Sequence, residues 1–336
     1  MNNPFIIAEI GQAHEGSLGM LYSYIDALAQ TGVDAIKFQM HIAEAESSEL
    51  EPFRVKFSLE DKTRFDYWKR MGFTLEQWKG IKQHCEQSGV EFLCSPFSNM
   101  AVDWLVEIGV KQYKIGAGEV NNLLLLGKIA QTGKPIILSS GMSSFEELDK
   151  TVAFLKERNV VFSILQCTTS YPTEPKQYGF NVIQELKQRY AIKVGYSDHS
   201  ANIATCIAAT ALGAEIIEFH AVFDRRKFGP DSKSSLTIDE IKDLVSYLKS
   251  INIALNNPID KSDNSNFREL KNIFEKSLAV NRDLPKGHII TFDDLEAKKP
   301  KECGISADLF ADIIGQKTNK PLKKWDFLNR EDLQNE

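Results

Sequence analysis

Short apolar runs alternate with amphipathic segments along the first three quarters of the chain. Eight such runs have the length and flanking turn residues of buried parallel strands, at residues 5–10, 35–39, 91–95, 112–115, 135–140, 160–167, 193–199 and 216–220. The segments between them carry apolar residues at helical spacing. Eight strand–helix units in a row predict an α/β protein with a closed (β/α)8 TIM barrel, whose ligand site lies at the carboxyl ends of the strands. A doubly wound open sheet is the alternative, but no dinucleotide-binding fingerprint is present.

Capping residues mark the starts of several predicted helices. Thr74 precedes a helical run, and Ser144 with Glu147 and Thr237 with Glu240 have the spacing of capping boxes. Residues 41–73, between the second strand and its helix, form a long polar segment that we expect to be a loop. Loops of this length are usually functional.

The pattern changes near residue 256, where a run rich in Asn, Asp and Ser begins. We expect a catalytic barrel over residues 1–255, a linker over 256–276 and a small β-rich domain over 277–336. Residues 284–295 are echoed by residues 322–333, which suggests a compact domain of pseudo-twofold design. A domain this small is expected to need support from a neighbour.

Composition and charge exclude several function classes. The 336 residues include 43% hydrophobic and 26% charged residues, an ordinary globular balance, and the formal charge of −6 argues against a nucleic-acid surface. No apolar stretch reaches 18 residues, so we expect no membrane partner, and the N-terminus lacks the pattern of a signal peptide. The five cysteines form no C-x-x-C pair and are expected to be reduced core residues of a cytoplasmic protein.

Polar side chains gather where the predicted strands end. His199 and His220 end neighbouring strands, so their imidazoles should converge as half of a divalent-metal site. The alternative is a pair of partly buried histidines that are hydrogen-bonded to the backbone. The other polar residues at these ends are Glu15, Lys37, Gln39, Ser95, Lys114, Glu119, Ser139, Ser140, Thr169, Tyr171 and Ser197.

Two of these residues are lysines in strands, where an unpaired charge would be costly. Lys37 and Lys114 should therefore have anionic partners. A structural ion pair with Glu9 or Glu119 is one possibility. With the nearby serines, the lysines would also make a pocket for a phosphate and a carboxylate through charge-assisted hydrogen bonds.

These residues belong to motifs that resemble the sialic acid synthase family, which makes N-acetylneuraminate and related nonulosonic acids. The resemblance covers nearly the whole chain, and its motifs follow the family order. The tail is similar to the family's antifreeze-like SAF domain, a small β-clip fold. The motifs are IAEIG at 7–11, HEG at 14–16, IKFQ at 36–39, SPFS at 95–98, YKIGAGE at 113–119, LSSGM at 138–142, CTTSYP at 167–172, GYSDH at 195–199, EFH at 218–220 and GPD at 229–231.

The resemblance implies a transferase that condenses phosphoenolpyruvate with the open aldehyde form of an N-acylated amino sugar. Phosphate would leave by C–O cleavage. It also implies that His199 and His220 hold Mn²⁺ or Mg²⁺, which polarises the aldehyde. Glu119 would position or deprotonate the attacking water, with Glu15 and Lys114 as further catalytic candidates. Phosphoenolpyruvate would be held by Lys37, Gln39, Ser95, Lys114, Ser140, Thr169 and Ser197, and sugar hydroxyls by Glu15, Tyr171 and Asp231.

The resemblance further implies a domain-swapped homodimer in which each tail covers the partner's barrel. The family's tail usually offers Arg-Pro to the sugar, whereas this chain has Lys299 before Pro300. Lysine keeps the charge but lacks the planar fork of arginine. Ala13, Ala117 and Thr169 also depart from common family residues. These changes leave open whether the substrate is N-acetylmannosamine or a deoxy or diacetamido relative.

Two other functions compete with this interpretation. One is another barrel enzyme that condenses phosphoenolpyruvate with a sugar, such as an octulosonate or heptulosonate phosphate synthase; the SAF-like tail argues against it. The other is a catalytically silent sugar-binding or scaffold protein. A silent relative would be free to lose Glu15, Lys37, Lys114, Glu119, His199 or His220, and all six are present.

Overall fold

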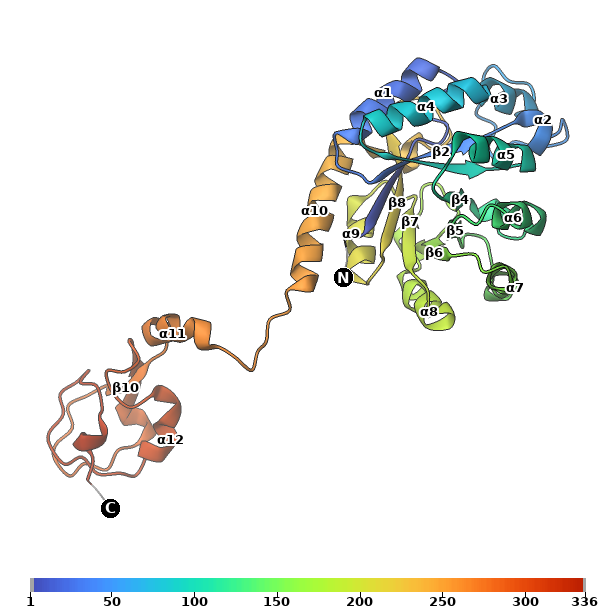
Figure 1. Cartoon of the computed structure of the whole chain (residues 1–336). Coiled ribbons are helices and arrows are strands. Elements are labelled where there is room, and N and C mark those ends of the chain that lie inside the picture. Colours follow the sequence, from blue (N-terminus) through green and yellow to red (C-terminus); the bar gives the residue numbers. More distant parts are fainter. Residues whose placement is uncertain (1–2, 335–336) are drawn as a thin grey trace. The chain divides into compact units, whose positions relative to one another are not determined.

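The computed structural model describes residues 3–334 of the chain. Two compact units divide between Asn257 and Pro258 (Figure 1), and each is considered by itself. Helix α11 (Arg268–Phe274) falls within residues 256–276, which we expected to form a linker. No helix among the described residues is long and apolar enough to cross a membrane.

The first unit is a closed parallel barrel, as the alternating pattern predicts. Each strand pairs with the next, and β1 also pairs with β8, which closes the sheet. A two-residue strand, β9 (Leu236–Thr237), pairs in parallel with the last two residues of β8. The eight barrel strands are β1 (Phe5–Glu9), β2 (Ala35–Met40), β3 (Glu91–Pro96), β4 (Tyr113–Ile115), β5 (Ile136–Ser139), β6 (Phe162–Cys167), β7 (Val194–Asp198) and β8 (Ile216–Val222).

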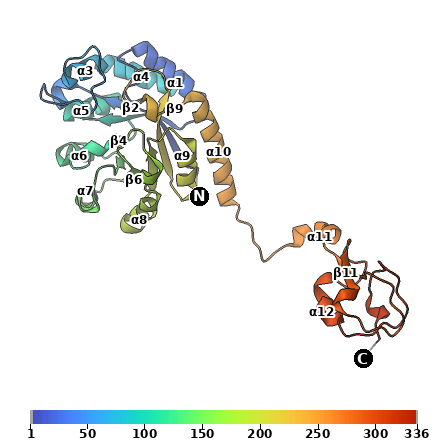
Figure 2. The ribbon, with the colours of Figure 1, turned by 180° about the vertical axis from the view of Figure 1, so that it is seen from behind.

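One long helix follows each barrel strand and packs on the outside of the sheet (Figures 1 and 2). The predicted caps are confirmed: Thr74, Ser144 and Thr237 each accept a hydrogen bond from the third backbone N–H of the following helix. The eight helices are α1 (Leu18–Ala29), α4 (Leu75–Gln87), α5 (Asn99–Ile108), α6 (Leu123–Ala130), α7 (Phe145–Glu157), α8 (Phe180–Tyr190), α9 (Ile203–Ala211) and α10 (Ile238–Asn256).

Residues 41–73, which we predicted to be a long polar loop, are not a loop throughout. The segment contains α2 (Ala43–Glu46) and α3 (Arg64–Met71), and Thr63 caps α3 through a capping box. The apolar residues of these helices pack as a separate cluster with Phe53, Phe57 and Phe65 at its edge. The helical pattern was hidden because only two turns of α3 are apolar on one face and charged residues surround them.

The barrel interior is layered along its axis. Strand side chains alternate between the two faces of a sheet, so every second residue points inward. The inward residues at one level form an apolar cluster of Ile7, Ala35, Leu93, Ile137, Leu165 and Ile216. Two residues further along, the inward side chains are polar: Glu9 lies beside Lys37 on β2, and Ser197 lies beside Glu218 on β8. The barrel therefore has an apolar base beneath a charged layer.

The second unit has its own small core and an internal repeat. Strands β10 (Ser277–Val280) and β11 (Leu295–Lys298) pair antiparallel, and α12 (Phe310–Ile313) completes the unit. Leu284 and Leu322 exchange backbone hydrogen bonds of 2.8 and 2.9 Å. Asn281 donates to the carbonyls of Asp293 and Leu295, and Asn319 does the same to those of Glu331 and Leu333. The repeat predicted from residues 284–295 and 322–333 is confirmed.

Short 3-10 turns connect several elements of both units. They are η1 (Ala117–Glu119), η2 (Pro175–Gln177), η3 (Ser232–Ser234), η4 (Ser265–Phe267), η5 (Phe292–Asp294), η6 (Ala307–Leu309) and η7 (Arg330–Asp332). All five cysteines are free thiols, and four are buried as expected, but Cys303 in the second unit is exposed.

Gly195 on β7 provides a test of barrel packing. A Cβ there would lie 2.4 Å from the carbonyl oxygen of Ile216 and 2.5 Å from Cδ2 of Leu165. Gly195→Ala should lower the free energy of unfolding by about 3 kcal/mol, because a packed interior resists added volume. The control is Gly19→Ala on α1, where a Cβ meets no atom within 4 Å and stability should rise by about 0.5 kcal/mol. Calorimetry of both variants tests this. Equal melting temperatures would show that β7 and β8 are not packed so closely.

Candidate active site

Four charged side chains form the buried layer inside the barrel. The Lys37 Nζ lies 2.8 Å from the Glu9 carboxylate and 3.4 Å from Glu218 Oε1. The Lys114 Nζ lies 3.0 Å from the same Glu218 oxygen and donates to Ser139 Oγ at 2.8 Å. None of the four charged side chains is more than 4% exposed. The predicted ion pair between Lys37 and Glu9 is present, but Lys114 pairs with Glu218, which the sequence did not single out.

The two lysines differ in their ion pairs: Lys37 lies close to both Glu9 and Glu218, whereas Lys114 pairs with Glu218. Burial alone would lower the pKa of Lys37, yet Glu218 and Glu9 outweigh it and raise that pKa. Burial lowers the pKa of Lys114, and the carboxylates of Glu218 and Glu9 do not restore it against the repulsion of Lys37. Lys114 is therefore the cation that would gain most from a bound anion.

The carboxylates of this layer are ionised. Burial would raise the pKa of Glu9, but Lys37, His220 and Lys114 hold it well below its usual range. Burial likewise opposes ionisation of Glu218, and Lys114 and Lys37 together lower its pKa. Two ammonium groups and two carboxylates thus compensate one another inside the barrel.

Not all of the expected phosphate ligands are free. The Ser197 Oγ donates to Glu218 Oε1 at 3.0 Å, and the Ser140 Oγ donates to Gln166 Oε1 at 3.4 Å. The Ser95 Oγ is buried and has no hydrogen-bond partner. It lies beside Gln39 in the register of β2 and β3. A buried hydroxyl without a partner is costly, so Ser95 is suited to a ligand oxygen.

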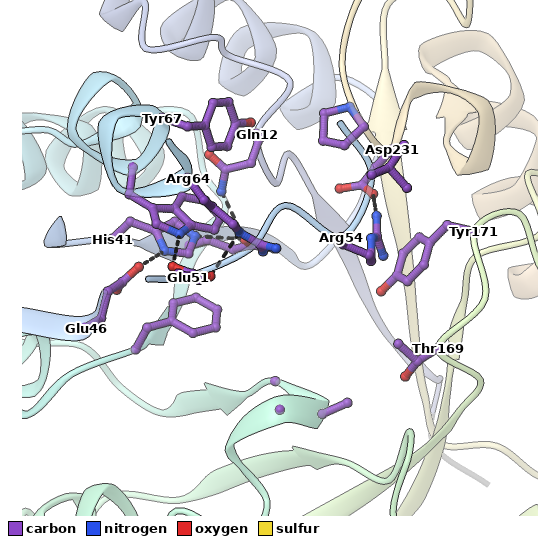
Figure 3. Close-up of a pocket in the computed structure, with 18 of the residues that line it drawn as sticks. Gln12, His41, Glu46, Glu51, Arg54, Arg64, Tyr67, Thr169, Tyr171 and Asp231 are labelled. Atoms are coloured by element: carbon purple, nitrogen blue, oxygen red, sulfur yellow. Dashed lines mark hydrogen bonds and ion pairs between the residues drawn. The ribbon is translucent and has the colours of Figure 1, made fainter. Parts of the chain in front are cut away.

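The main cavity of the barrel has a volume of about 460 Å³. Figure 3 shows residues from opposite sides of it. Six predicted site residues line this cavity: Gln39, Glu119, Thr169, Tyr171, His220 and Asp231. The predicted residues outside its lining are Glu15, Lys37, Ser95, Lys114, Ser140, Ser197 and His199, and Lys299 belongs to the second unit.

His199 and His220 converge as predicted, with their ring centroids 5.2 Å apart. Burial and the neighbouring His220 lower the pKa of His199 to about 3, so this ring is neutral. The His199 Nδ1–H donates to the Thr168 carbonyl at 2.9 Å, which leaves the lone pair on Nε2. The His220 Nε2 lies 3.2 Å from the Glu9 carboxylate, so in the neutral ring its lone pair is on Nδ1.

Two imidazoles that each offer a ring-nitrogen lone pair would fit a divalent metal ion whose remaining ligands are water or substrate oxygens. The described residues contain no group of three or more His, Cys, Asp and Glu arranged to hold a metal by themselves. The donor set is therefore an incomplete one that leaves coordination positions open, as catalytic metal sites do.

Glu119 lies in η1 at the wall of the cavity. Burial raises its pKa; the neighbouring Glu46 adds to this rise, and a 2.7 Å hydrogen bond from Asn122 opposes it. The expectation that Lys114 might pair with Glu119 is wrong, because the ammonium of Lys114 faces Glu218. A carboxylate with a raised pKa is a better base toward water than an ordinary one.

The other end of the cavity carries the predicted sugar ligands. The Asp231 carboxylate accepts from Arg54 at 3.2 Å, and the guanidinium of Arg54 lies 4.3 Å from the ring centroid of Tyr171 (Figure 3). Glu15 has a left-handed backbone, with φ at 51°, and its buried Oε1 has no hydrogen-bond partner. Burial raises the pKa of Glu15 despite the guanidinium of Arg70, which lies 3.7 Å away.

Sequence reasoning missed several residues of the cavity wall. Most of them come from residues 41–73, whose unusual length was the only signal. Gln12, close to the HEG motif, was also missed. The missed residues of that segment are His41, Glu46, Glu51, Arg54, Val55, Phe57, Arg64, Tyr67 and Trp68.

The chain belongs to the NeuB family, whose model matches residues 24–260, and residues 275–333 match the SAF domain. These matches agree with the family resemblance of the motifs.

Three relatives illustrate this membership. The chain is 34% identical to the N,N'-diacetyllegionaminic acid synthase of Campylobacter jejuni, over 96% of this chain and 98% of that protein. It is 32% identical to the human N-acetylneuraminate-9-phosphate synthase, over 98% and 93%. The solved N-acetylneuraminic acid synthetase of Leptospira borgpetersenii, in complex with citrate, has 32% identity and a TM-score of 0.71, covering 80% of this chain and 91% of that one.

The buried charges predict how stability depends on pH. The folded-state pKa values of Glu9 and Glu218 are lowered, so their contribution is present above the ordinary value of 4.5 and is lost as pH falls. Glu218→Gln should lower the free energy of unfolding at pH 7 by about 3–5 kcal/mol, because it leaves a buried lysine without its partner. Its stability should also depend less steeply on pH below about 4.5.

Urea unfolding between about pH 3 and pH 7 measures both effects. Glu76→Gln is the matched control, because the side chain of Glu76 is 81% exposed. It should change stability only slightly. If Glu218→Gln and Glu76→Gln behave alike, the carboxylates of the barrel do not carry this part of the stability.

Proposed function

We propose that the chain condenses phosphoenolpyruvate with the open-chain form of an N-acylated amino sugar, giving a sialic or other nonulosonic acid and phosphate. The observation that supports this most is the buried charged layer inside the barrel. The pKa of Lys114 is lowered there despite the nearby Glu218, so the negative charge of an enol phosphate would stabilise its ammonium form. The names of the relatives support the same reaction, because each is a synthase of an acid of this class.

We infer that phosphoenolpyruvate binds at the lysine end of the site. Lys37 and Lys114 supply the cationic field, and the unpartnered Ser95 hydroxyl donates to an oxygen of the anion. The other proposed contacts come from Gln39, Ser140, Thr169 and Ser197. Ser140 and Ser197 must exchange their present acceptors, Gln166 and Glu218, for the ligand.

The amino sugar is proposed to bind at the opposite end, through Glu15, Tyr171 and Asp231. The proposed reaction requires this sugar to be an N-acylated aldose. N-acetylmannosamine and its deoxy or diacetamido relatives all meet that requirement. The relatives named above differ in their products, since they include synthases of a diacetylated legionaminic acid and of a phosphorylated N-acetylneuraminate.

The proposed reaction joins C3 of phosphoenolpyruvate to the aldehyde carbon of the sugar. The cationic C2 that results takes a water molecule, and Glu119 accepts a proton from that water. Collapse of the intermediate forms the keto group and releases phosphate with its bridging oxygen, which is C–O cleavage. A divalent ion, Mn²⁺ or Mg²⁺, held by His199 and His220 would polarise the aldehyde carbonyl.

We further propose a homodimer in which each SAF domain covers the partner's barrel. In that arrangement Lys299 would meet the N-acyl end of the sugar. Within its own unit, the Lys299 Nζ lies 4.9 Å from the ring centroid of Phe274. A single ammonium donor holds an acyl carbonyl less specifically than the fork of an arginine, which favours a sugar altered at that end.

The proposed reaction is tested by incubation with phosphoenolpyruvate and a panel of amino-sugar aldoses. We expect phosphate release with one or a few sugars. The product mass should equal the sugar plus phosphoenolpyruvate plus one water, less the released phosphoric acid. In ¹⁸O-labelled water the label should enter the keto acid and not the phosphate, because the C–O bond breaks.

A chelator should abolish turnover, and manganese should not rescue His220→Ala. Full activity in chelator would rule out the metal, and labelled phosphate would rule out C–O cleavage.

The proposed dimer is tested by mixing a variant altered in the SAF domain with a variant altered in the barrel. A Lys299→Ala chain should bind the sugar more weakly by about 1 kcal/mol, the scale of one hydrogen bond, and should show altered sugar preference. Mixed with a Glu119→Gln chain, it should regain activity through hybrid dimers that contain one intact composite site. Lys299→Arg is the matched control that keeps the charge. A monomer by light scattering, or unchanged sugar preference in Lys299→Ala, would contradict the proposal.

A further inference from the structure

A buried histidine–carboxylate pair lies on the cavity wall, on the side away from Asp231 (Figure 3). The His41 Nδ1 is 2.5 Å from the Glu46 carboxylate, and the two side chains are 5% and 7% exposed. The His41 ring is stacked between Trp68 and Phe97, with centroid distances of 3.8 and 4.5 Å. His41 comes directly after β2, and Glu46 is the last residue of α2. None of the roles proposed above uses this pair.

The hydrogen bonds around Gln39 fix the proton on the other nitrogen of this ring. Glu9 is ionised and can only accept, so the group that faces it at 2.6 Å is the amide nitrogen of Gln39. The amide oxygen of Gln39 must then face Gln12 at 3.0 Å and the His41 Nε2 at 3.1 Å. Since an amide oxygen is an acceptor only, the His41 Nε2 carries a proton.

With Nε2 protonated, one further proton must lie between Nδ1 and Glu46. Without it, the Nδ1 lone pair and a carboxylate oxygen would face each other at 2.5 Å in a buried place. With it, the pair is either an imidazolium beside a carboxylate or an imidazole beside a carboxylic acid. Both forms contain the same number of protons, and both keep Nε2–H directed at Gln39.

We propose that His41 and Glu46 form a positioning pair whose shared proton fixes the amide of Gln39 in the active site. One N–H of the Gln39 amide donates to Glu9, and the amide oxygen accepts from Gln12 and His41. The second N–H is therefore available to a ligand in the cavity. The pair also holds Glu9 in place against Lys37 and His220, through Gln39. The catalytic consequence rests on the proposed function, whereas the shared proton itself does not.

Charged and titratable groups from several elements surround the pair. Gln39 on β2 donates a hydrogen bond to Glu9 of β1 and so connects Glu9 to the pair. The charge of Glu46 raises the pKa of Glu119 in η1. Arg64 of α3 lies over Trp68 but is neutralised by Glu51 at 3.0 Å. A protonated His41 also helps to lower the pKa of His14, which burial brings to about 3. None of these groups is a partner that could replace Glu46 on Nδ1.

The first experiment observes the proton itself. Nitrogen-15 NMR of histidine-labelled full-length protein should show a strongly downfield ring proton in the free protein, absent from His41→Gln and from Glu46→Gln. Glu44→Gln is the matched control, because Glu44 lies on the same helix and its side chain is 67% exposed. It should leave the signal unchanged. A His41 ring without a proton on Nε2 would overturn the proposal whatever the enzyme's activity.

The second experiment separates positioning from other roles. His41→Ala removes the donor to Gln39 and should lower kcat/KM for the condensation about tenfold, the scale of one buried hydrogen bond. In His41→Gln, the amide nitrogen can take the place of Nε2, so most of this loss should be restored. In Glu46→Gln, the new amide can donate to Nδ1 of a neutral ring, so Gln39 stays fixed and kcat/KM near neutrality should fall no more than about threefold.

Rescue by a matched variant distinguishes a positioning pair from ordinary packing. His41→Gln should recover most of the activity that His41→Ala loses, whereas a role in packing alone predicts similar losses in both. No recovery in His41→Gln, while it and His41→Ala keep the wild-type melting temperature, would overturn the proposal. If no sugar reacts at all, the proposed function fails, and the NMR result still decides whether the proton is shared.

Discussion

The mutual compensation of four buried charges is the constraint on which this barrel depends. Glu9, Lys37, Lys114 and Glu218 lie on four different strands, and none could remain ionised inside the barrel without the others. The cluster therefore requires β1, β2, β4 and β8 to keep their register. A shift of one residue on any of these strands would turn its charge to the outside and leave the others unpaired. Stability and site geometry are in this way two results of the same contacts.

This layer also connects the separate parts of the site. Glu9 contacts Lys37 toward the lysine end, His220 toward the histidine pair and Gln39 toward the cavity wall. Because one carboxylate has all three partners, a change at any of them alters the electrostatics of the rest. An anion that binds at Lys114 would add negative charge next to Glu218. Two lysines already share Glu218, which would offset the repulsion between that carboxylate and a bound anion.

The sequence predicted the barrel because the alternation of buried strands and amphipathic helices is strong and repeated. It predicted Lys37, His199 and His220 because polar residues at the ends of apolar runs are unusual. It did not single out Glu218, since that residue sits within the apolar run of β8 and only the register shows which lysines it meets. It also missed His41 and Arg54, whose positions follow from the folding of residues 41–73 rather than from any local pattern.

Two kinds of polar contact in this site differ in what a substitution can remove. In the charged layer, each group compensates a charge, so an uncharged substitute leaves a partner unpaired and the barrel loses stability together with activity. His41 and Glu46 share one proton. An amide in place of the Glu46 carboxylate can donate to Nδ1 of His41, and Nε2–H of His41 still donates to Gln39. The first kind of contact cannot separate folding from function. The second kind can, because a substitution there can keep the hydrogen bonds of Gln39.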